Sequence, residues 1–217
     1  MNLKIQMDET EGDNDDVKSW RQEAKRFAAD YKVNAYPTFL IFSPEGELVH
    51  RIVGSAEADQ FIASAKDGLN PDTQYETLVK KFNANPNDKG IAKAAANAAV
   101  KAYDRDMTAK TIESLINNST TDELMADDVF PLLTKNIGKP GSTAFNIVLE
   151  NKAKVDSILG ANQADQLLAI AIINNDVAPV VSKSEEDIFD KTIDEVTQKY
   201  PDVKLANVAA SFKTNYY

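Results

Sequence analysis

The first 70 residues combine strand-like and helix-like hydrophobic patterns. Leu3, Ile5 and Met7 are separated by polar residues, which predicts a short strand with one buried face. From residue 15 to 32, apolar residues recur every three or four positions, which predicts an amphipathic helix with one buried stripe. That stripe comprises Val17, Trp20, Ala24, Phe27, Ala28 and Tyr31. We therefore expect Trp20 to lie in the core rather than to act as a ligand platform.

A hairpin follows this helix. Residues 38–42 form a continuous apolar run, which is typical of a strand covered on both faces. Pro44 and Gly46 suit a tight turn, and residues 48–53 alternate with polar residues on both faces, as an edge strand does. His50, the one histidine, is expected to be a surface residue of that strand. Ser55 and Gly68 then mark the start and end of a second helix.

From Pro71 onward the hydrophobic pattern is helical almost throughout. Short breaks occur at residues 85–87, 138–141 and 200–202, and Thr120 with Glu123 forms a predicted capping box. This pattern indicates antiparallel helix pairs in an irregular, repeat-like array without a tetratricopeptide signature. The predicted fold class is α/β plus all-α, with an α/β domain over residues 1–70 and an α-helical domain over residues 71–217.

The charge and composition narrow the possible partners. The 217 residues carry a net charge of −10, which argues against nucleic-acid binding because phosphate recognition depends on Lys and Arg. No apolar run approaches the roughly 18 residues of a membrane helix, so membrane insertion is not expected. The acidic stretch of residues 8–16 lacks the spacing of a calcium loop, and we expect no metal site and no cofactor.

The order of elements around Pro37 resembles the C-terminal portion of a thioredoxin. An amphipathic helix, the segment Ala35, Tyr36, Pro37 and Thr38, an apolar strand, a Pro-Glu-Gly turn, an edge strand and a final helix follow one another. The sequence of this segment is most similar to those of bacterial envelope thioredoxin-domain proteins with a helical C-terminal extension. The resemblance implies a partial thioredoxin-like fold and a location in the periplasm or cell envelope.

The resemblance also implies a site. The proline that matches Pro37 is cis in this family, and the backbone of the preceding residue, here Tyr36, is free to pair with an extended substrate segment. Ala35, Tyr36, Pro37 and Thr38 are therefore the candidate residues for binding a substrate or peptide. No catalytic residue is assigned, because thiol–disulfide exchange needs a thiolate and the chain contains no cysteine.

The chain departs from the family at its N-terminal side. Relatives have further strands and a Cys-x-x-Cys helix before the segment that matches residues 3–7. In their sheet, one of these strands lies between the strands that match residues 3–7 and 38–42, and this strand is lacking here. We expect residues 3–7 to pair directly with residues 38–42, or a second copy in a homodimer or the helical region to fill the gap. The predicted function is non-catalytic protein or peptide binding. The alternative is a fragment of a thiol–disulfide oxidoreductase whose Cys-x-x-Cys segment lies upstream of Met1.

Overall fold

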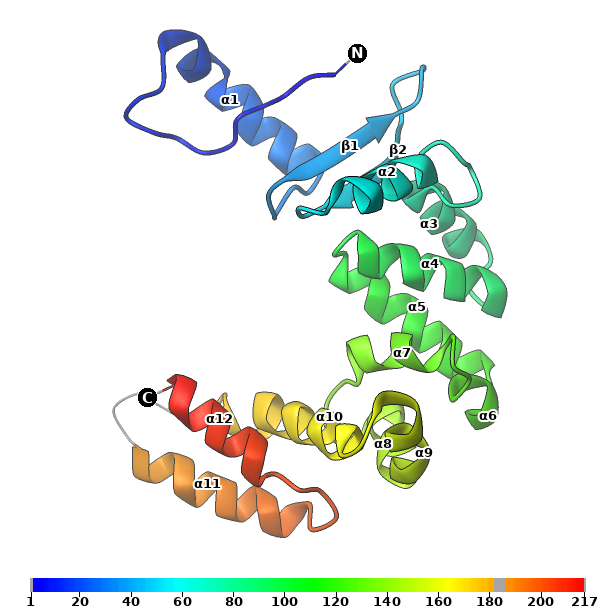
Figure 1. Cartoon of the computed structure of the whole chain (residues 1–217), viewed down its shortest axis with the longest axis vertical. Coiled ribbons are helices and arrows are strands. Elements are labelled where there is room, and N and C mark those ends of the chain that lie inside the picture. The colour runs from blue at the N-terminus through cyan, green and yellow to red at the C-terminus, as the bar shows by residue number, and fades with distance from the viewer. Residues whose placement is uncertain (1, 182–185, 217) are drawn as a thin grey trace. The chain divides into compact units, whose positions relative to one another are not determined.

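The computed structural model describes residues 2–181 and 186–216, and Figure 1 shows the order of their elements. The chain divides into two compact units. The first unit comprises Met1–Thr77 with Lys101–Tyr103, and the second comprises Leu78–Val100 with Asp104–Tyr217. The domain boundary expected at residue 70 stays a prediction.

The first unit is built around an antiparallel hairpin. Its elements are α1 (Asp15–Asp30), β1 (Thr38–Phe42), β2 (Leu48–Val53), α2 (Ala58–Asp67) and the start of α3 (Tyr75–Ala84). Thr38 lies opposite Val53 and Phe39 opposite Ile52, and an irregularity in the register falls between Ile41 and Phe42. The predicted helix–hairpin–helix order of residues 15–68 is confirmed.

The two helices that flank the hairpin contact side chains of opposite parity on β1. The ring of Tyr31, directly after α1, lies 5.2 Å from the ring of Phe42. On α2, the ring of Phe61 lies 4.7 Å from the ring of Phe39. Because successive side chains of a strand point to opposite faces, α1 and α2 pack on different faces of the hairpin.

Four expectations for this unit are wrong. The helix α2 begins at Ala58 with Glu57 at its cap position, rather than at Ser55. Residues 3–7 form no strand, and Leu3 is 71% exposed. Trp20 is 64% exposed, because the α1 side contacts the hairpin through Tyr31. At 1.5 Å per residue, Tyr31 lies about 16 Å along the helix axis from Trp20. His50 is buried, because the segment that leads into α3 covers its face of β2.

The described residues of the second unit form helices joined by turns and loops, with no strand among them. After most of α3 it contains α4 (Lys89–Lys101), α5 (Arg105–Asn118), α6 (Thr121–Leu124), α7 (Phe130–Leu133), a 3₁₀ turn η1 (Thr134–Asn136), α8 (Thr143–Glu150), α9 (Lys152–Leu159), α10 (Gln163–Ile172), a π-helical turn η2 (Ile173–Val177), α11 (Glu186–Lys199) and α12 (Ala206–Tyr216). The predicted capping box is present: Thr120 and Glu123 each accept the backbone N–H of the other.

The main hydrophobic core lies entirely in this second unit. It runs from Leu78 and Phe82 through Phe130 and Phe145 to Ala209. Four alanines of α4 are fully buried, and their small side chains let neighbouring helices approach closely: these are Ala92, Ala95, Ala96 and Ala99. The expected fold class is confirmed as a short α/β region with two strands followed by a mostly helical region. Over the described residues, no helix is both long enough and apolar enough to cross a membrane.

Candidate functional site

Ala35, Tyr36, Pro37 and Thr38 form a tight loop that leads into β1, here called the Pro37 loop. The Tyr36–Pro37 peptide bond is cis, as the resemblance implied. Thr38 Oγ1 donates a hydrogen bond to the carbonyl of Ala35 at 2.7 Å, and the carbonyl of Pro37 accepts one from Gly54 N at 2.9 Å. The loop is thus closed on itself and fastened to the end of β2.

Tyr36 is the exposed residue of this loop. Its side chain is 63% exposed, and within the described ranges neither its backbone N–H nor its carbonyl has a hydrogen-bond partner. The tyrosine therefore presents an aromatic ring and two free main-chain groups at one point of the surface.

The edge of β1 next to this loop is open. Because the Pro37 carbonyl points to β2, and backbone groups alternate in direction along a strand, the N–H and C=O groups of Thr38 and Leu40 point away from β2. The sheet has only the strands β1 and β2 among the residues that the structure describes. These groups are consequently available for pairing with another extended segment.

Two polar side chains, those of Arg51 and His50, make structural hydrogen bonds that hold the hairpin in place. Arg51 donates to Glu76 Oε1 at 2.8 Å and to the carbonyl of Tyr31 at 3.1 Å, which ties α1, β2 and α3 together. His50 Nδ1 accepts the backbone N–H of Tyr75 at 3.1 Å. Burial lowers the pKa of His50, so the ring is neutral at pH 7. Sequence patterns gave no sign of either contact, because each joins residues 20 or more positions apart.

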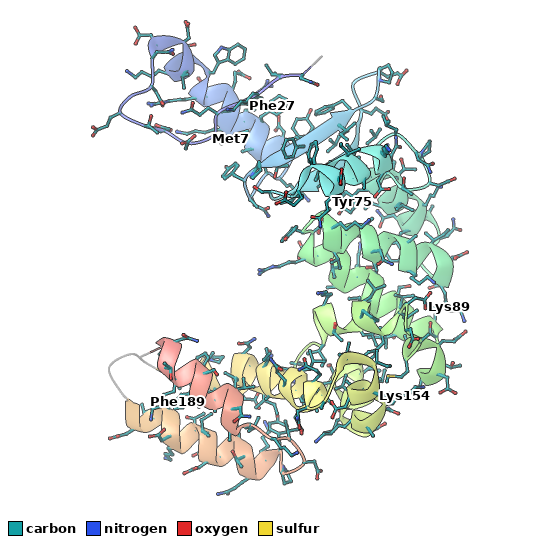
Figure 2. All side chains as sticks on the ribbon, in the orientation of Figure 1. Met7, Phe27, Tyr75, Lys89, Lys154 and Phe189 are labelled. Carbon is teal, nitrogen blue, oxygen red and sulfur yellow. The ribbon has the colours of Figure 1, made fainter. Side chains whose placement is uncertain are left out.

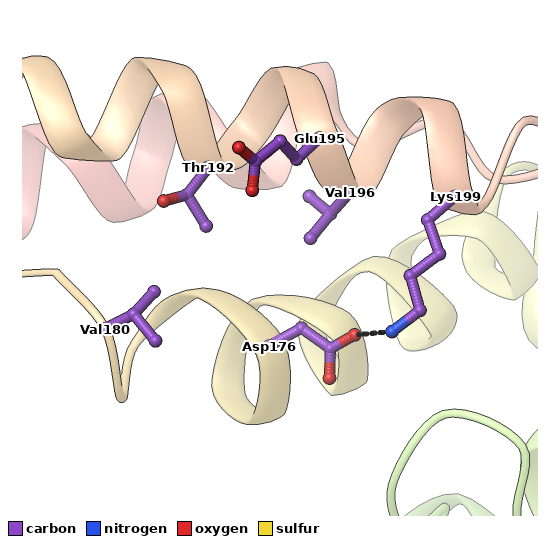
Figure 3. A pocket seen from close by; sticks show the side chains of 6 residues that line it. All are labelled: Asp176, Val180, Thr192, Glu195, Val196 and Lys199. Carbon is purple, nitrogen blue, oxygen red and sulfur yellow. Dashed lines mark hydrogen bonds and ion pairs between the residues drawn. The ribbon is translucent and has the colours of Figure 1, made fainter.

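A second group of titratable side chains borders a cavity of about 400 Å³ between η2 and α11 (Figure 3). Lys199 Nζ and Tyr200 Oη both donate to Asp176 Oδ2 at 2.8 Å. Burial raises the pKa of Asp176, but these two hydrogen bonds and the charge of Lys199 together outweigh burial and lower it overall. The contact with Asp176 raises the pKa of Lys199, and burial raises that of Tyr200. The pKa values of all three groups are thus shifted away from neutral pH, as expected for a structural ion pair.

The described residues contain no group of three or more His, Cys, Asp or Glu placed to hold a metal ion. The one assignment that the sequence offered, the Pro37 loop, stays a prediction for binding, and the structure adds to it the open edge of β1. No short sequence pattern predicts this open edge, because it depends on which strands lie beside β1.

Comparison with known proteins identifies the first unit. No curated protein and no solved structure shows significant similarity to the chain. Residues 2–69 match the family described as a thioredoxin-like domain. The helix-flanked hairpin with its cis Tyr36–Pro37 bond is therefore a thioredoxin-like domain, in a chain that has no cysteine and so no Cys-x-x-Cys redox site.

Proposed function

We propose that the thioredoxin-like domain is a non-catalytic module that binds an extended protein or peptide segment at the Pro37 loop and along the open edge of β1. The observation that carries this proposal is the unpartnered main chain of Tyr36 beside the outward-pointing groups of Thr38 and Leu40. An added strand satisfies such groups by main-chain hydrogen bonds, which give affinity with little demand on sequence.

Exposed aromatic rings add a preference for apolar ligand side chains. Phe39 remains 40% exposed although its ring contacts Phe61, and Tyr36 is 63% exposed. A ligand strand would place alternate side chains on one face, where the ring of Phe39 lies. We therefore expect the preferred segment to be uncharged and to carry an aliphatic or aromatic residue at every second position.

Redox turnover is not part of this proposal. Exchange requires a thiolate to attack a disulfide sulfur, and this chain has none. In an insulin-reduction assay with dithiothreitol, the full chain should give the rate of the control without protein. Turnover clearly above that control would contradict a non-catalytic role.

Peptide binding can be tested with a matched pair of tyrosines. The probe is a library of acetylated, amidated ten-residue peptides made of uncharged residues, and affinity is measured by fluorescence anisotropy on the full chain. Tyr36→Ala should weaken the best ligand about tenfold, the amount expected for one lost aromatic contact of roughly 1.4 kcal/mol. Tyr103→Ala is the control, since Tyr103 is 65% exposed but lies outside the Pro37 loop. Equal effects of both changes would sink the assignment.

A second copy of the chain is the other occupant that we propose to test. Pairing of two β1 edges would make a continuous sheet across a homodimer, and such pairing would compete with peptide. Sedimentation velocity of the full chain with and without the best peptide separates these occupants. If the peptide dissociates the dimer, the peptide and the second copy both bind at β1. If the dimer stays intact when peptide is added, β1 is not part of the dimer interface.

A further inference from the structure

Residues 3–7 belong to the first unit but form no regular structure in it. Apolar and polar side chains alternate along this segment, which is the period of a strand with one buried face. Among the described residues, no backbone N–H or C=O group of the segment has a hydrogen-bond partner. Ile5 and Met7 are half-buried, whereas Leu3 is 71% exposed (Figure 2). The segment thus has the pattern of a strand but no partner strand.

The loop that follows this segment is fixed on α1. Glu9 contacts Lys25 Nζ at 2.7 Å and the guanidinium of Arg21 at 3.3 Å. Asp13 contacts the same guanidinium at 2.7 Å. These ion pairs hold the chain from Glu9 onward and leave residues 2–8, here called the N-terminal arm. Seven residues span at most about 25 Å when extended, so the arm can reach away from α1 without breaking these contacts.

The open edge of β1 offers the main-chain partners that the arm lacks. The outward-pointing groups of Thr38 and Leu40 have no strand beside them among the described residues. Next to these groups, the side chain of Phe39 is 40% exposed. The segment expected at this edge carries an apolar side chain at every second position. Residues 3–7 have that spacing, with Lys4 as their one charged residue.

A second copy of the chain can supply both missing partners at once. Within one chain, the structure leaves the N-terminal arm and the edge of β1 unpaired among the described residues. Two copies that exchange arms would pair both, and because the exchange is reciprocal it closes as a two-fold dimer. Pairing of two β1 edges would instead leave residues 3–7 unpaired in each copy.

The charges at the two ends of the arm and of β1 favour one direction of pairing. The acidic stretch of residues 8–16 follows residues 3–7 directly. In a parallel pair, this stretch would lie beside the β1–β2 turn, which carries Glu45 and Glu47. In an antiparallel pair, it would lie beside the loop before β1, which carries Lys32. Because like charges repel, antiparallel pairing is favoured.

We infer that residues 3–7 of one copy add as an antiparallel strand to β1 of a second copy. Ile5 then lies opposite Phe39. Leu3, two residues earlier, lies opposite Ile41. The apolar side chains of the arm therefore share the face of β1 on which the exposed ring of Phe39 lies.

This register also pairs the main chains. Lys4 lies opposite Leu40, and Gln6 lies opposite Thr38. Both pairing residues of the arm are thus within the alternating segment, and both face the outward-pointing groups of β1. Self-association therefore covers the edge proposed for peptide binding and regulates access to it. The inference rests on the proposed function only in using the same edge, and it does not require that a foreign peptide bind there.

Self-association is measured by sedimentation velocity on the full chain over a series of concentrations. Leu3→Asp should raise the dissociation constant of the dimer at least about tenfold, because a leucine that the dimer buries is replaced by a charged side chain. Leu69→Asp is the matched control and should leave the constant unchanged, since Leu69 is 78% exposed in the same unit but lies outside the arm. A chain that stays monomeric throughout the series, or equal effects of the two changes, would overturn the inference.

Cysteine cross-linking tests the register, and the cysteine-free chain gives no background. A mixture of Ile5→Cys chains and Phe39→Cys chains should form a disulfide between the two variants under mild oxidation. Ile5→Cys mixed with Tyr103→Cys should not, because Tyr103 is 65% exposed but lies outside β1. A disulfide within a monomer that carries both Ile5→Cys and Phe39→Cys, without any dimer, would overturn pairing between copies. Cross-linking of Phe39→Cys chains only to one another would overturn it in favour of two paired β1 edges.

Peptide binding separates the failure of this inference from the failure of the proposed function. At protein concentrations above the dissociation constant of the dimer, Leu3→Asp should bind the best peptide more tightly than the unaltered chain, because it frees the edge of β1. Peptide binding that Leu3→Asp leaves unchanged under these conditions would overturn the inference alone. Cross-linking of Ile5→Cys to Phe39→Cys in a chain that binds no peptide would support the inference and overturn the proposed function.

Discussion

His50 shows how much of a residue's character depends on its neighbours. Its side chain is 7% exposed, and its Nδ1 can accept the Tyr75 N–H only while that nitrogen carries no proton. Burial lowers the pKa of this ring, and Lys101 lowers it further, while Asp67, the backbone of Ser64 and Glu76 act in the opposite direction. The neutral ring is thus a structural acceptor.

The first prediction concerns the effect of acid on this contact. The pKa of His50 is lower in the folded chain than its ordinary value of 6.5, so the unfolded chain binds the proton more readily. The contribution of His50 is complete above about pH 6.5 and is lost as the pH falls below it. Urea unfolding at pH 7.5 and 5.5 should show a larger loss of stability for the unaltered chain than for His50→Asn. Parallel losses would contradict the prediction.

The second prediction concerns Gly68, whose Cα hydrogen faces the same region. A Cβ at this position would lie 2.5 Å from Ile41 Cδ1 and 3.2 Å from His50 Cδ2. The end of the Ile41 side chain must then shift, so Gly68→Ala should destabilise the first unit by about 1 kcal/mol through overpacking. Gly12→Ala is the control, because nothing lies within 4 Å of its added Cβ. Thermal unfolding of both variants measures the difference, and equal melting temperatures would refute it.

At the scale of elements, nearby residues set where helices and turns begin and end, whereas tertiary contacts decide whether a strand forms. The boundaries of the hairpin and of the capped helix after Thr120 follow from turn and cap residues that act within a few positions. The strand expected at residues 3–7 had a correct alternation but no partner strand in the structure. An alternating segment becomes a strand only where another strand accepts its hydrogen bonds.

The third prediction concerns the capping box of α6. Thr120 Oγ1 accepts the N–H of Glu123, and Glu123 Oε2 accepts the N–H of Thr120 at 2.9 Å. Thr120→Ala should lower the free energy of unfolding by about 1 kcal/mol. Thr121→Ala, one position inside the helix and also exposed, should change it by no more than about 0.5 kcal/mol. Urea titration compares the two, and a larger effect at Thr121 would exclude the cap as the cause.

At the scale of the whole molecule, buried apolar surface is distributed unevenly. Among the described residues, the buried hydrophobic side chains of the first unit are those of Ala24, Ile52, Tyr75 and Ala102. The continuous core from Leu78 to Ala209 lies in the second unit. A two-stranded hairpin has little surface to cover its helices, so exposed residues such as Trp20 and Leu3 remain in the first unit.

The fourth prediction follows from this uneven core. Local opening is easiest where few apolar contacts must be broken. Amides of β1 and β2 should therefore exchange with deuterium faster than amides of α10, with protection lower by about a factor of ten or more. Hydrogen exchange read by mass spectrometry on the full chain measures both sets in one sample. Equal protection would mean that the two units open together.

The sequence by itself determined the local features of this protein. Helical periodicity, the turn at Pro44 and Gly46 and the Thr120 cap are set by residues within a few positions of one another. The absence of a thiolate is equally a property of the sequence, and it removes redox exchange from this chain whatever its fold.

Only the tertiary structure decided which of these features face solvent, a neighbour or a groove. The burial of His50, the exposure of Trp20 and the open edge of β1 depend on segments distant in sequence. The groove between α10 and α12 likewise exists only because two helices about 40 residues apart pack side by side. Periodicity identifies a helix face, but the partner of that face is fixed by packing across the whole unit.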